Sequence, residues 1–168
     1  MKISLHLAIS ADGFIAKQDG DSTWVSRADE ELFVQRAKEA GCIVVGRTTY
    51  KQYEGSIYPI PGVLNIVLTK SHQGVAPTEQ VVLARTPDDA IVLARKHGCT
   101  SLLIAGGAAT AAAFIDQGLV RDIFFSIHPI LLEDGIRLFS DISKDTRYRL
   151  VGERHLAEGV KEKHYAMI

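Results

Sequence analysis

Short apolar runs alternate with helical or polar segments over the first two thirds of the chain. The runs end at glycine, proline or polar residues that favour turns, so each is interpreted as a buried β-strand. The five runs cover residues 3–9, 42–45, 63–68, 81–84 and 101–105. Helices are expected between and after them, over residues 26–39, 47–50, 86–97 and 108–117. Strands that alternate with helices in this way are typical of a parallel sheet with helices on both faces.

The ends of the predicted helices carry capping residues. Ser26 and Asp29 fit a capping box at the start of the first helix, and Gly41 fits its end. Thr86 fits the N-cap of the helix after the fourth strand, with Pro87 at its first position. These residues indicate helix boundaries independently of the hydrophobic pattern.

The pattern changes after Gly118. An apolar strand over residues 123–127 is followed by a bend, and two further strands, 147–156 and 160–168, flank a hairpin turn. The expected fold class is therefore α/β: a mostly parallel central sheet with helices on both faces and a C-terminal antiparallel hairpin. The length of 168 residues favours a single domain over residues 1–168.

Composition excludes several classes of protein. The 19 lysines and arginines balance 20 acidic residues, for a net charge of −1, so the basic surface of a nucleic-acid-binding protein is not expected. No apolar stretch approaches the roughly 18 residues of a membrane helix, and no signal peptide is recognised. Cys42 and Cys99 each open an apolar run, so both are interpreted as reduced cysteines of a cytoplasmic protein. The six histidines do not cluster, so no metal site is expected.

Three strand ends carry residues suited to binding a ligand. Such sheets bind ligands at the carboxyl ends of their strands, where glycine lets the backbone approach closely. Asp12-Gly13 follows the first strand, Gly46-Arg47-Thr48-Thr49 the second and Gly106-Gly107 the fifth. An arginine at a helix N-terminus is electrostatically unfavourable unless an anion such as phosphate binds there. The alternative is that the glycines only form tight turns and that the arginine is a solvated side chain.

Asp29 is the carboxylate with the clearest candidate role. A purely structural role, capping of the helix that starts at Ser26, fully explains an aspartate at this position. The functional alternative places it at the mouth of an apolar pocket lined by Trp24 and Phe33, where burial tunes its pKa. In that position Asp29 could hold a protonated heterocycle or donate a proton.

Five segments together resemble the dihydrofolate reductase-like superfamily. In chain order they are residues 10–16 (SADGFIA), 22–26 (STWVS), 46–50 (GRTTY), 104–107 (IAGG) and 129–139 (PILLEDGIRLF). The resemblance is to the branch named after the C-terminal reductase domain of the bifunctional deaminase-reductase of riboflavin biosynthesis, and it covers nearly the whole chain. The deaminase signature, H-x-E with P-C-x-x-C, does not occur in the sequence, so the chain resembles a stand-alone reductase domain.

The resemblance implies NADPH as the cofactor. Arg47 and the threonines after it match a phosphate-binding turn, Lys70 and Ser71 match the strand end that faces the 2′-phosphate, and Ile15 and Ala16 match the loop over the nicotinamide. The full set of implied cofactor contacts is Ala8, Ile15, Ala16, Gly46, Arg47, Thr48, Thr49, Thr69, Lys70, Ser71, Gly106, Gly107, Ala108 and Ala109.

The resemblance also implies a substrate site. Trp24 and Asp29 keep the spacing found in true dihydrofolate reductases, in which the aspartate binds the pterin, and Ser126 falls where those enzymes place a threonine. Asp29 and Ser126 are therefore the expected catalytic residues, and Trp24, Asp29 and Phe33 the expected substrate contacts. A departure bears on the substrate, because the riboflavin branch carries a lysine in the first strand where this chain has His6.

The expected function is an NADPH-dependent reductase of a pyrimidine-like or pterin-like small molecule. One candidate substrate is 5-amino-6-(5-phosphoribosylamino)uracil. The alternatives are a nucleotide-binding module of the same fold without turnover, and a structural or interaction protein. A homodimer built on the antiparallel edge is expected, because the hairpin over residues 147–168 otherwise leaves an exposed sheet edge.

Overall fold

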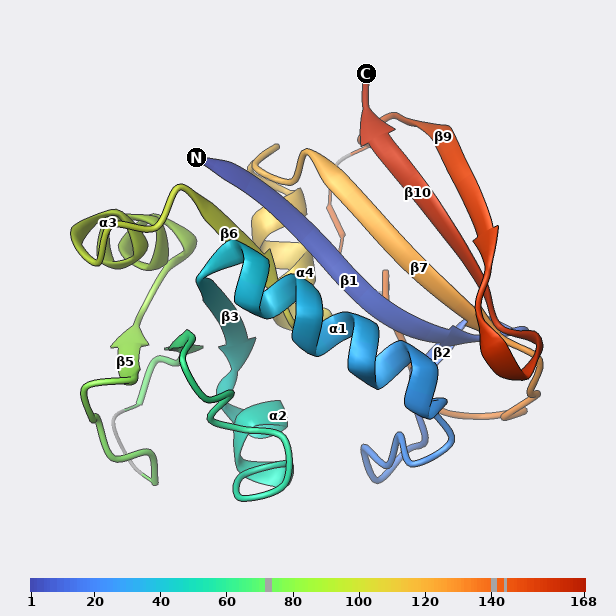
Figure 1. Cartoon of the computed structure of the whole chain (residues 1–168), viewed down its shortest axis with the longest axis horizontal. Helices are drawn as coiled ribbons and strands as arrows, with labels where there is room; N and C mark the ends of the chain where they lie inside the picture. Colours follow the sequence, from blue (N-terminus) through green and yellow to red (C-terminus); the bar gives the residue numbers. More distant parts are fainter. Residues whose placement is uncertain (72–73, 140–141, 144) are drawn as a thin grey trace.

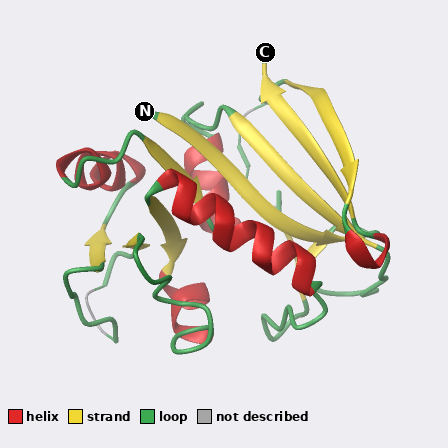
Figure 2. Cartoon of the chain, viewed as in Figure 1, coloured by secondary structure: helices red, strands yellow, loops and turns green. Residues whose placement is uncertain are grey.

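An eight-stranded sheet forms the centre of the protein (Figures 1 and 2). The computed structural model describes residues 1–71, 74–139, 142–143 and 145–168. The strand order is β5-β4-β3-β6-β1-β7-β10-β9. The strands are β1 (Lys2–Ser10), β3 (Cys42–Gly46), β4 (Leu64–Leu68), β5 (Val81–Ala84), β6 (Ser101–Ile104), β7 (Asp122–His128), β9 (Tyr148–His155) and β10 (Lys161–Met167).

The strands from β5 to β7 in this order run parallel, whereas β10 and β9 are antiparallel to their neighbours. A short 3₁₀ helix, η1 (Ala157–Gly159), joins β9 to β10 at the predicted hairpin turn. The mostly parallel sheet and its C-terminal antiparallel hairpin are thus confirmed. Each predicted strand is present, with ends that differ from the prediction by at most one residue.

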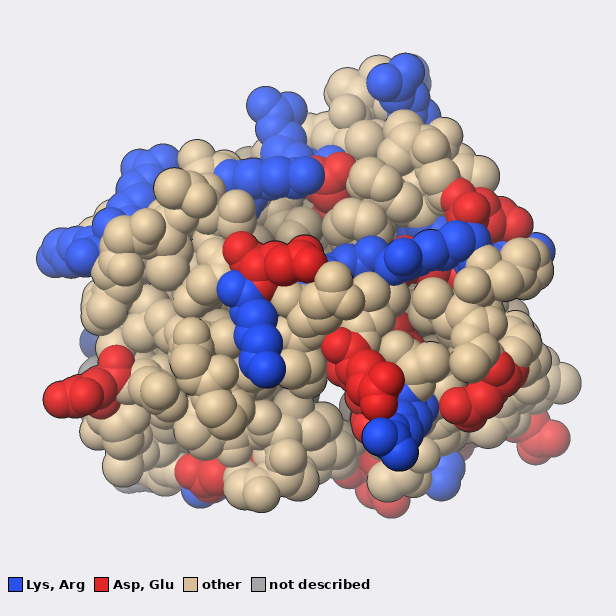
Figure 3. Space-filling model, in the orientation of Figure 1, with Lys and Arg blue, Asp and Glu red and all other residues tan. Residues whose placement is uncertain are grey.

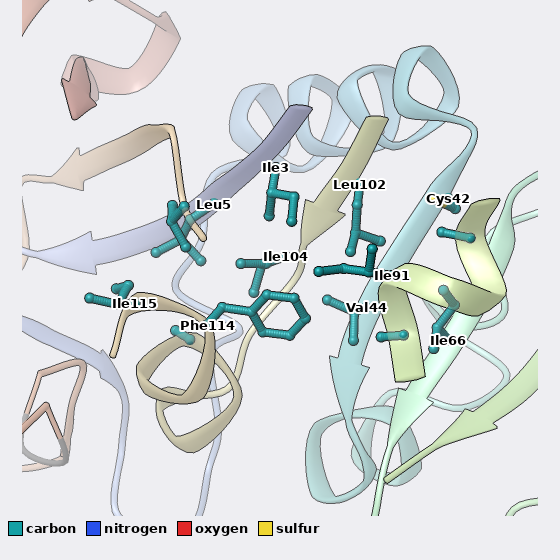
Figure 4. Close-up of a cluster of buried hydrophobic side chains, with 14 of the residues drawn as sticks. Ile3, Leu5, Cys42, Val44, Ile66, Ile91, Leu102, Ile104, Phe114 and Ile115 are labelled. Carbon is teal, nitrogen blue, oxygen red and sulfur yellow. The ribbon is translucent and has the colours of Figure 1, made fainter. Parts of the chain in front are cut away.

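Helices cover both faces of the sheet, as predicted. Apolar and polar residues do not alternate along β3, because both of its faces are buried. Cys42 and Val44 pack on one face, and Ile43 and Val45 on the other. The first face is covered by α3 and α4, from which Phe114 points toward the strands in Figure 4. The second face is covered by α1 and α2. The helices are α1 (Arg27–Ala40), α2 (Arg47–Gln52), α3 (Pro87–Lys96) and α4 (Ala108–Ile115).

The start of α1 departs from the prediction in one respect. Ser26 is the N-cap, and its Oγ accepts the backbone N–H of Asp29 over 3.3 Å. The Asp29 carboxylate does not return a bond to the N-cap backbone, because it is hydrogen-bonded to His6 and Ser126. The predicted capping box is therefore only half formed, and the carboxylate of Asp29 serves contacts outside its own helix.

A small antiparallel sheet was not predicted. It pairs β2 (Phe14–Ala16) with β8 (Ile136–Arg137), which are too short to show a hydrophobic pattern. Beside it, the Asp12 carboxylate accepts the backbone N–H groups of Leu132 and Glu133 over 3.1 and 2.9 Å. These contacts hold the loop after β1 at the edge of the main sheet where ligands of parallel sheets bind.

Candidate active site

A cavity of about 1390 Å³ opens where the parallel strands end. Its walls come from β1, from α1, and from the segments that follow β3, β4, β5 and β6. Every residue that the family resemblance implied as a cofactor contact lines this cavity: Ala8, Ile15, Ala16, Gly46, Arg47, Thr48, Thr49, Thr69, Lys70, Ser71, Gly106, Gly107, Ala108 and Ala109. The strand-end motifs of the sequence therefore meet in one place.

Glycines allow the backbone segments after β3 and β6 to meet in this cavity. The N–H of Gly46 donates to the carbonyl of Gly106 over 2.9 Å, and the peptide bond between Gly106 and Gly107 is cis. A Cβ at Gly46 would lie 2.7 Å from Oγ1 of Thr110, and one at Gly107 would lie 3.0 Å from Oγ1 of Thr49. A side chain at either position would displace its neighbour, so the wall here is built from bare backbone.

Among the residues that the structure describes, three cationic side chains line the cavity: Arg47, Lys70 and Arg85. They follow β3, β4 and β5, which are adjacent in the sheet. Adjacent strands lie about 4.8 Å apart, so the three cations span about 10 Å along the sheet edge. Sequence reasoning missed Arg85, although it directly follows a predicted strand, because none of the five resembling segments includes it. A row of cations with this spread suits a ligand that carries several phosphates.

Asp29 lies in the same cavity, on the side of β1, and is 2% exposed. Nε2 of His6 lies 2.9 Å from Oδ1 of Asp29, and the Ser126 hydroxyl donates to the same oxygen. Burial works to raise the pKa of the Asp29 carboxyl, but the hydrogen bonds from His6 and Ser126 outweigh it and hold the pKa below its usual value. Asp29 is therefore ionised at neutral pH. It is suited to accepting hydrogen bonds from a ligand and poorly suited to donating a proton.

A buried chain of side chains fixes the orientation of His6. Nη1 of Arg36 lies 2.7 Å from Nδ1 of His6. A guanidinium has only donors, so Nδ1 accepts and the imidazole proton is assigned to Nε2, which faces Asp29. Arg36 also binds the Glu162 carboxylate through both terminal nitrogens. The chain of contacts from Glu162 to Asp29 thus fixes the orientation of His6. No sequence motif marked Arg36 or Glu162.

The other expected substrate-site residues lie in three different places. Phe33 lines the cavity, and its ring meets that of His6 edge-on at a centroid distance of 5.7 Å. Ser126 is fully buried beside Asp29 and outside the cavity lining, so its contact is with Asp29. Trp24 is not among the residues that line the main cavity. It lines a separate hollow of about 170 Å³, where its ring packs edge-on against His128 at a centroid distance of 5.3 Å.

Other kinds of site are not found in the part of the chain that the structure describes. No group of three or more histidine, cysteine, aspartate or glutamate side chains there could hold a metal ion. No helix among those residues has the length and apolar character needed to cross a membrane. Figure 3 shows basic and acidic side chains interspersed over the face that it draws, without an extended basic surface.

Comparison with known proteins connects this geometry to a family. A family model for the RibD C-terminal domain matches residues 1–161. The uncharacterized protein YwjB of Bacillus subtilis (strain 168) is 24% identical over 169 residues, covering 98% of this chain and 97% of YwjB. The riboflavin biosynthesis protein RibD of Mycobacterium tuberculosis (strain CDC 1551 / Oshkosh) is 28% identical over 157 residues. That alignment covers 83% of this chain and 45% of RibD, so the chain spans about half of that protein.

A solved structure shares the fold over nearly its full length. Dihydrofolate reductase from Enterococcus faecalis, complexed with NADP(H) and RAB-propyl, matches with a TM-score of 0.79 at 18% identity. The match covers 99% of this chain and 96% of that one. The dihydrofolate reductase-like fold expected from the sequence is thereby confirmed.

Proposed function

The chain belongs to the RibD C-terminal domain family, and from this membership and the cavity we propose that it is an NADPH-dependent reductase of a small heterocyclic molecule. The substrate is pyrimidine-like or pterin-like, and 5-amino-6-(5-phosphoribosylamino)uracil is one candidate. The proposal includes a cytoplasmic, single-domain protein that forms a homodimer, as expected from the sequence.

The observation that supports the proposal is that two kinds of residue line different parts of one cavity. Cations and bare glycine backbone line the part of the cavity at the ends of β3, β4, β5 and β6, and a buried carboxylate lines the part beside β1. Phosphates bind well to cations and to free backbone N–H groups at helix starts. A carboxylate among apolar side chains binds N–H donors of a ring. Two ligands of these kinds, side by side, are what a nicotinamide-dependent reductase must hold.

The residues present fit NADPH. The backbone around Gly46 and Gly107 leaves a cradle that a Cβ would fill, which suits the close approach of a pyrophosphate. Arg47 would bind phosphate there, and Lys70 with Ser71 would bind the 2′-phosphate. Bound NADPH supplies a hydride to the substrate. Ile15, held by the loop after β1, would cover the site and exclude water.

On the substrate side, the chain's own residues bind and orient the ring. Asp29 accepts hydrogen bonds from ring N–H groups, and Phe33 gives the ring an apolar surface. His6 and Ser126 hold the carboxylate in place through its Oδ1. Correct placement of a reacting pair contributes to catalysis by removing the entropy cost of bringing the two together.

The experiment that tests the proposal combines binding with turnover. Calorimetry with NADPH and NADH measures cofactor binding, and the absorbance of reduced nicotinamide follows oxidation with dihydrofolate and with 5-amino-6-(5-phosphoribosylamino)uracil. NADPH binding followed by substrate-dependent oxidation supports the reductase. Binding without oxidation, across a wider panel of pterins and pyrimidines, would favour the non-catalytic nucleotide-binding module. Absence of any nucleotide binding would overturn both.

A further inference from the structure

The two cysteines of the chain lie close together in the fold and outside the cavity. They are 57 positions apart in the sequence, from 42 to 99. Cys42 begins β3, and Cys99 lies in the short segment between α3 and β6. Both side chains pack in the apolar cluster of which Figure 4 labels Cys42. The cavity opens at the other end of β3, where Gly46 lines it, so this pair of thiols is separate from the candidate active site.

Three contacts place the two thiols beside each other. A hydrogen bond joins the side chains of Cys42 and Cys99. Sγ of Cys42 also donates to the carbonyl of Ser101 over 2.9 Å, and Ser101 is only two residues after Cys99. A Cβ on Gly41, the residue before Cys42, would lie 3.9 Å from Sγ of Cys99. Sγ of Cys99 therefore lies against the start of β3, within reach of the Cys42 thiol.

The two thiols differ in their access to solvent. Cys42 is 0% exposed, whereas Cys99 is partly exposed. Burial and the hydrogen bond with Cys99 raise the pKa of the Cys42 thiol, so this thiol is protonated at neutral pH. The thiolate is the form of cysteine that reacts with disulfides. A reagent in solution therefore reacts first with Cys99, and Cys42 reacts only afterwards and slowly.

We propose that Cys42 and Cys99 form a redox-sensitive disulfide within the chain. The oxidant is a low-molecular-weight disulfide such as oxidised glutathione. The Cys99 thiolate attacks one sulfur of this reagent, whose S–S bond breaks, so that one thiol leaves and a mixed disulfide forms on Cys99. Cys42 then loses its proton and attacks Sγ of Cys99, and the second thiol leaves. In sum, the protein loses two hydrogen atoms, one S–S bond forms in it, and the reagent is reduced to two thiols.

The disulfide links the start of β3 to the segment that leads into β6. The backbone N–H of Cys99 donates to the carbonyl of Ala94 over 3.0 Å, so this segment is anchored to the end of α3. A link between positions this far apart constrains the unfolded chain, and that effect outweighs the loss of the hydrogen bond from Cys42 to Ser101. We therefore expect the oxidised protein to unfold at a higher urea concentration than the reduced protein. The inference is independent of the proposed reductase function.

The test follows the mass of the intact, folded protein during incubation with oxidised glutathione. The mass should fall by two hydrogen atoms, and no glutathione should remain attached. The rate should be independent of protein concentration and higher at mildly alkaline than at neutral pH, because Cys42 must lose its proton. Dithiothreitol should restore the original mass. An unchanged mass, a glutathione adduct that persists, or a disulfide between two chains would overturn the proposal.

A matched pair of serine variants tests the order of the two steps. Cys42→Ser should retain one glutathione on Cys99, because the thiol that displaces it is missing. Cys99→Ser should take up no glutathione while folded, because Cys42 is fully buried. Circular dichroism checks that both variants fold, and a serine at position 42 can still donate to the Ser101 carbonyl. Equal glutathione uptake by the two folded variants, or equal urea midpoints of the oxidised and reduced unsubstituted protein, would also count against the proposal.

Discussion

The Arg36 guanidinium donates to Nδ1 of His6 over 2.7 Å, and this contact determines which nitrogen of the imidazole carries the proton. The remaining N–H then faces Asp29, whose carboxylate stays ionised. Arg36 lies outside the cavity lining, yet through His6 it orients the N–H group that faces Asp29 inside the cavity. Arg36 is therefore a positioning residue.

Replacing Arg36 by methionine should lower both stability and activity. The change leaves Glu162 buried with Arg154 as its remaining partner, and breaking a buried ion pair costs about 3 kcal/mol. It also frees Nδ1 of His6, so the ring gains a second tautomer, visible by nitrogen NMR. Urea unfolding gives the stability. Arg27→Met is the control, because Arg27 pairs with Glu31 in an exposed position on the same helix. A single His6 tautomer in the Arg36 variant would contradict this account.

Asp29→Asn should lower kcat/KM while the protein stays folded. The variant keeps an oxygen for His6 but loses the charge, and a hydrogen bond to a charged group contributes about 1.5–3 kcal/mol, or tenfold to hundredfold in affinity. The helix cap survives, because Ser26 binds the backbone N–H of residue 29 and not its side chain. Steady-state kinetics on any substrate that is turned over, with a melting curve, makes the comparison. Full activity in the folded variant would contradict a substrate-binding role for the Asp29 carboxylate.

The same variant gives a pH signature. The folded-state pKa of Asp29 is below the unfolded value of about 3.9, so its contribution to stability is present above that value and is lost as pH falls through the folded pKa. The free energy of unfolding, measured with urea, should therefore fall more steeply on acidification in the unsubstituted protein than in Asp29→Asn. Parallel pH profiles for the two proteins would show that Asp29 is not the group responsible.

NADPH should bind more tightly than NADH, and Lys70→Ala should remove most of that preference, because Lys70 is assigned to the 2′-phosphate that distinguishes the two cofactors. A charge-assisted contact to phosphate is worth about 1.5–3 kcal/mol, which is tenfold to hundredfold in affinity. Arg47 and Arg85 line the same side of the cavity and should retain part of the affinity for phosphate. Calorimetry at low salt is the measurement, because screening weakens these contacts. Equal affinities of the unsubstituted protein for the two cofactors would refute the assignment.

Gly107→Val should abolish cofactor binding in a folded protein. A Cβ at this position would lie 3.0 Å from Oγ1 of Thr49, and the two further methyl groups would enter the cavity. Gly152→Val is the matched control, because a Cβ there meets only the Cβ of His164 at 3.8 Å, an ordinary contact. Nucleotide fluorescence and circular dichroism should separate the two variants. An unchanged NADPH affinity in Gly107→Val would falsify the cradle model.

The protein should form a homodimer through the antiparallel edge. β9 is the last strand of the sheet, and Leu150 and Val151 on it are 49% and 45% exposed. An exposed strand edge with apolar side chains favours pairing with another chain. Light scattering at micromolar concentration should give the dimer mass, and Leu150→Lys should shift it toward the monomer. A monomer mass for the unsubstituted protein would rule the dimer out.

Most of the fold could be predicted from local pattern, because the buried parallel strands are mainly apolar and the two longest helices, α1 and α3, have recognisable caps. The small sheet formed by residues 14–16 and 136–137 could not, because strands of two or three residues have no period to detect. For the cofactor side of the site, glycine and arginine directly follow strands, and strand ends converge by topology. The motifs therefore predicted where these residues lie.

The substrate side was harder to predict, because its geometry depends on contacts between distant elements. Arg36 and Glu162 are 126 positions apart, and nothing in either local sequence indicates the pair. Trp24 was misplaced for a related reason. Its spacing to Asp29 suggested a shared pocket, but the ring direction is determined by His128, which lies far along the chain. Spacing along a chain predicts proximity of backbone and not the direction of a side chain.

The position of β1 within the sheet has a consequence for how the chain folds. β1 lies between β6 and β7, and its pairings join Lys2 with Ser101 and Ser4 with Asp122. During synthesis, the central strand therefore remains unpaired until about a hundred more residues have left the ribosome. Leu5, fully buried in the finished sheet, stays exposed throughout that interval. Such long-range pairing slows folding and exposes unpaired strands to other chains, so this topology delays closure of the core around β1 until β6 and β7 have been synthesised.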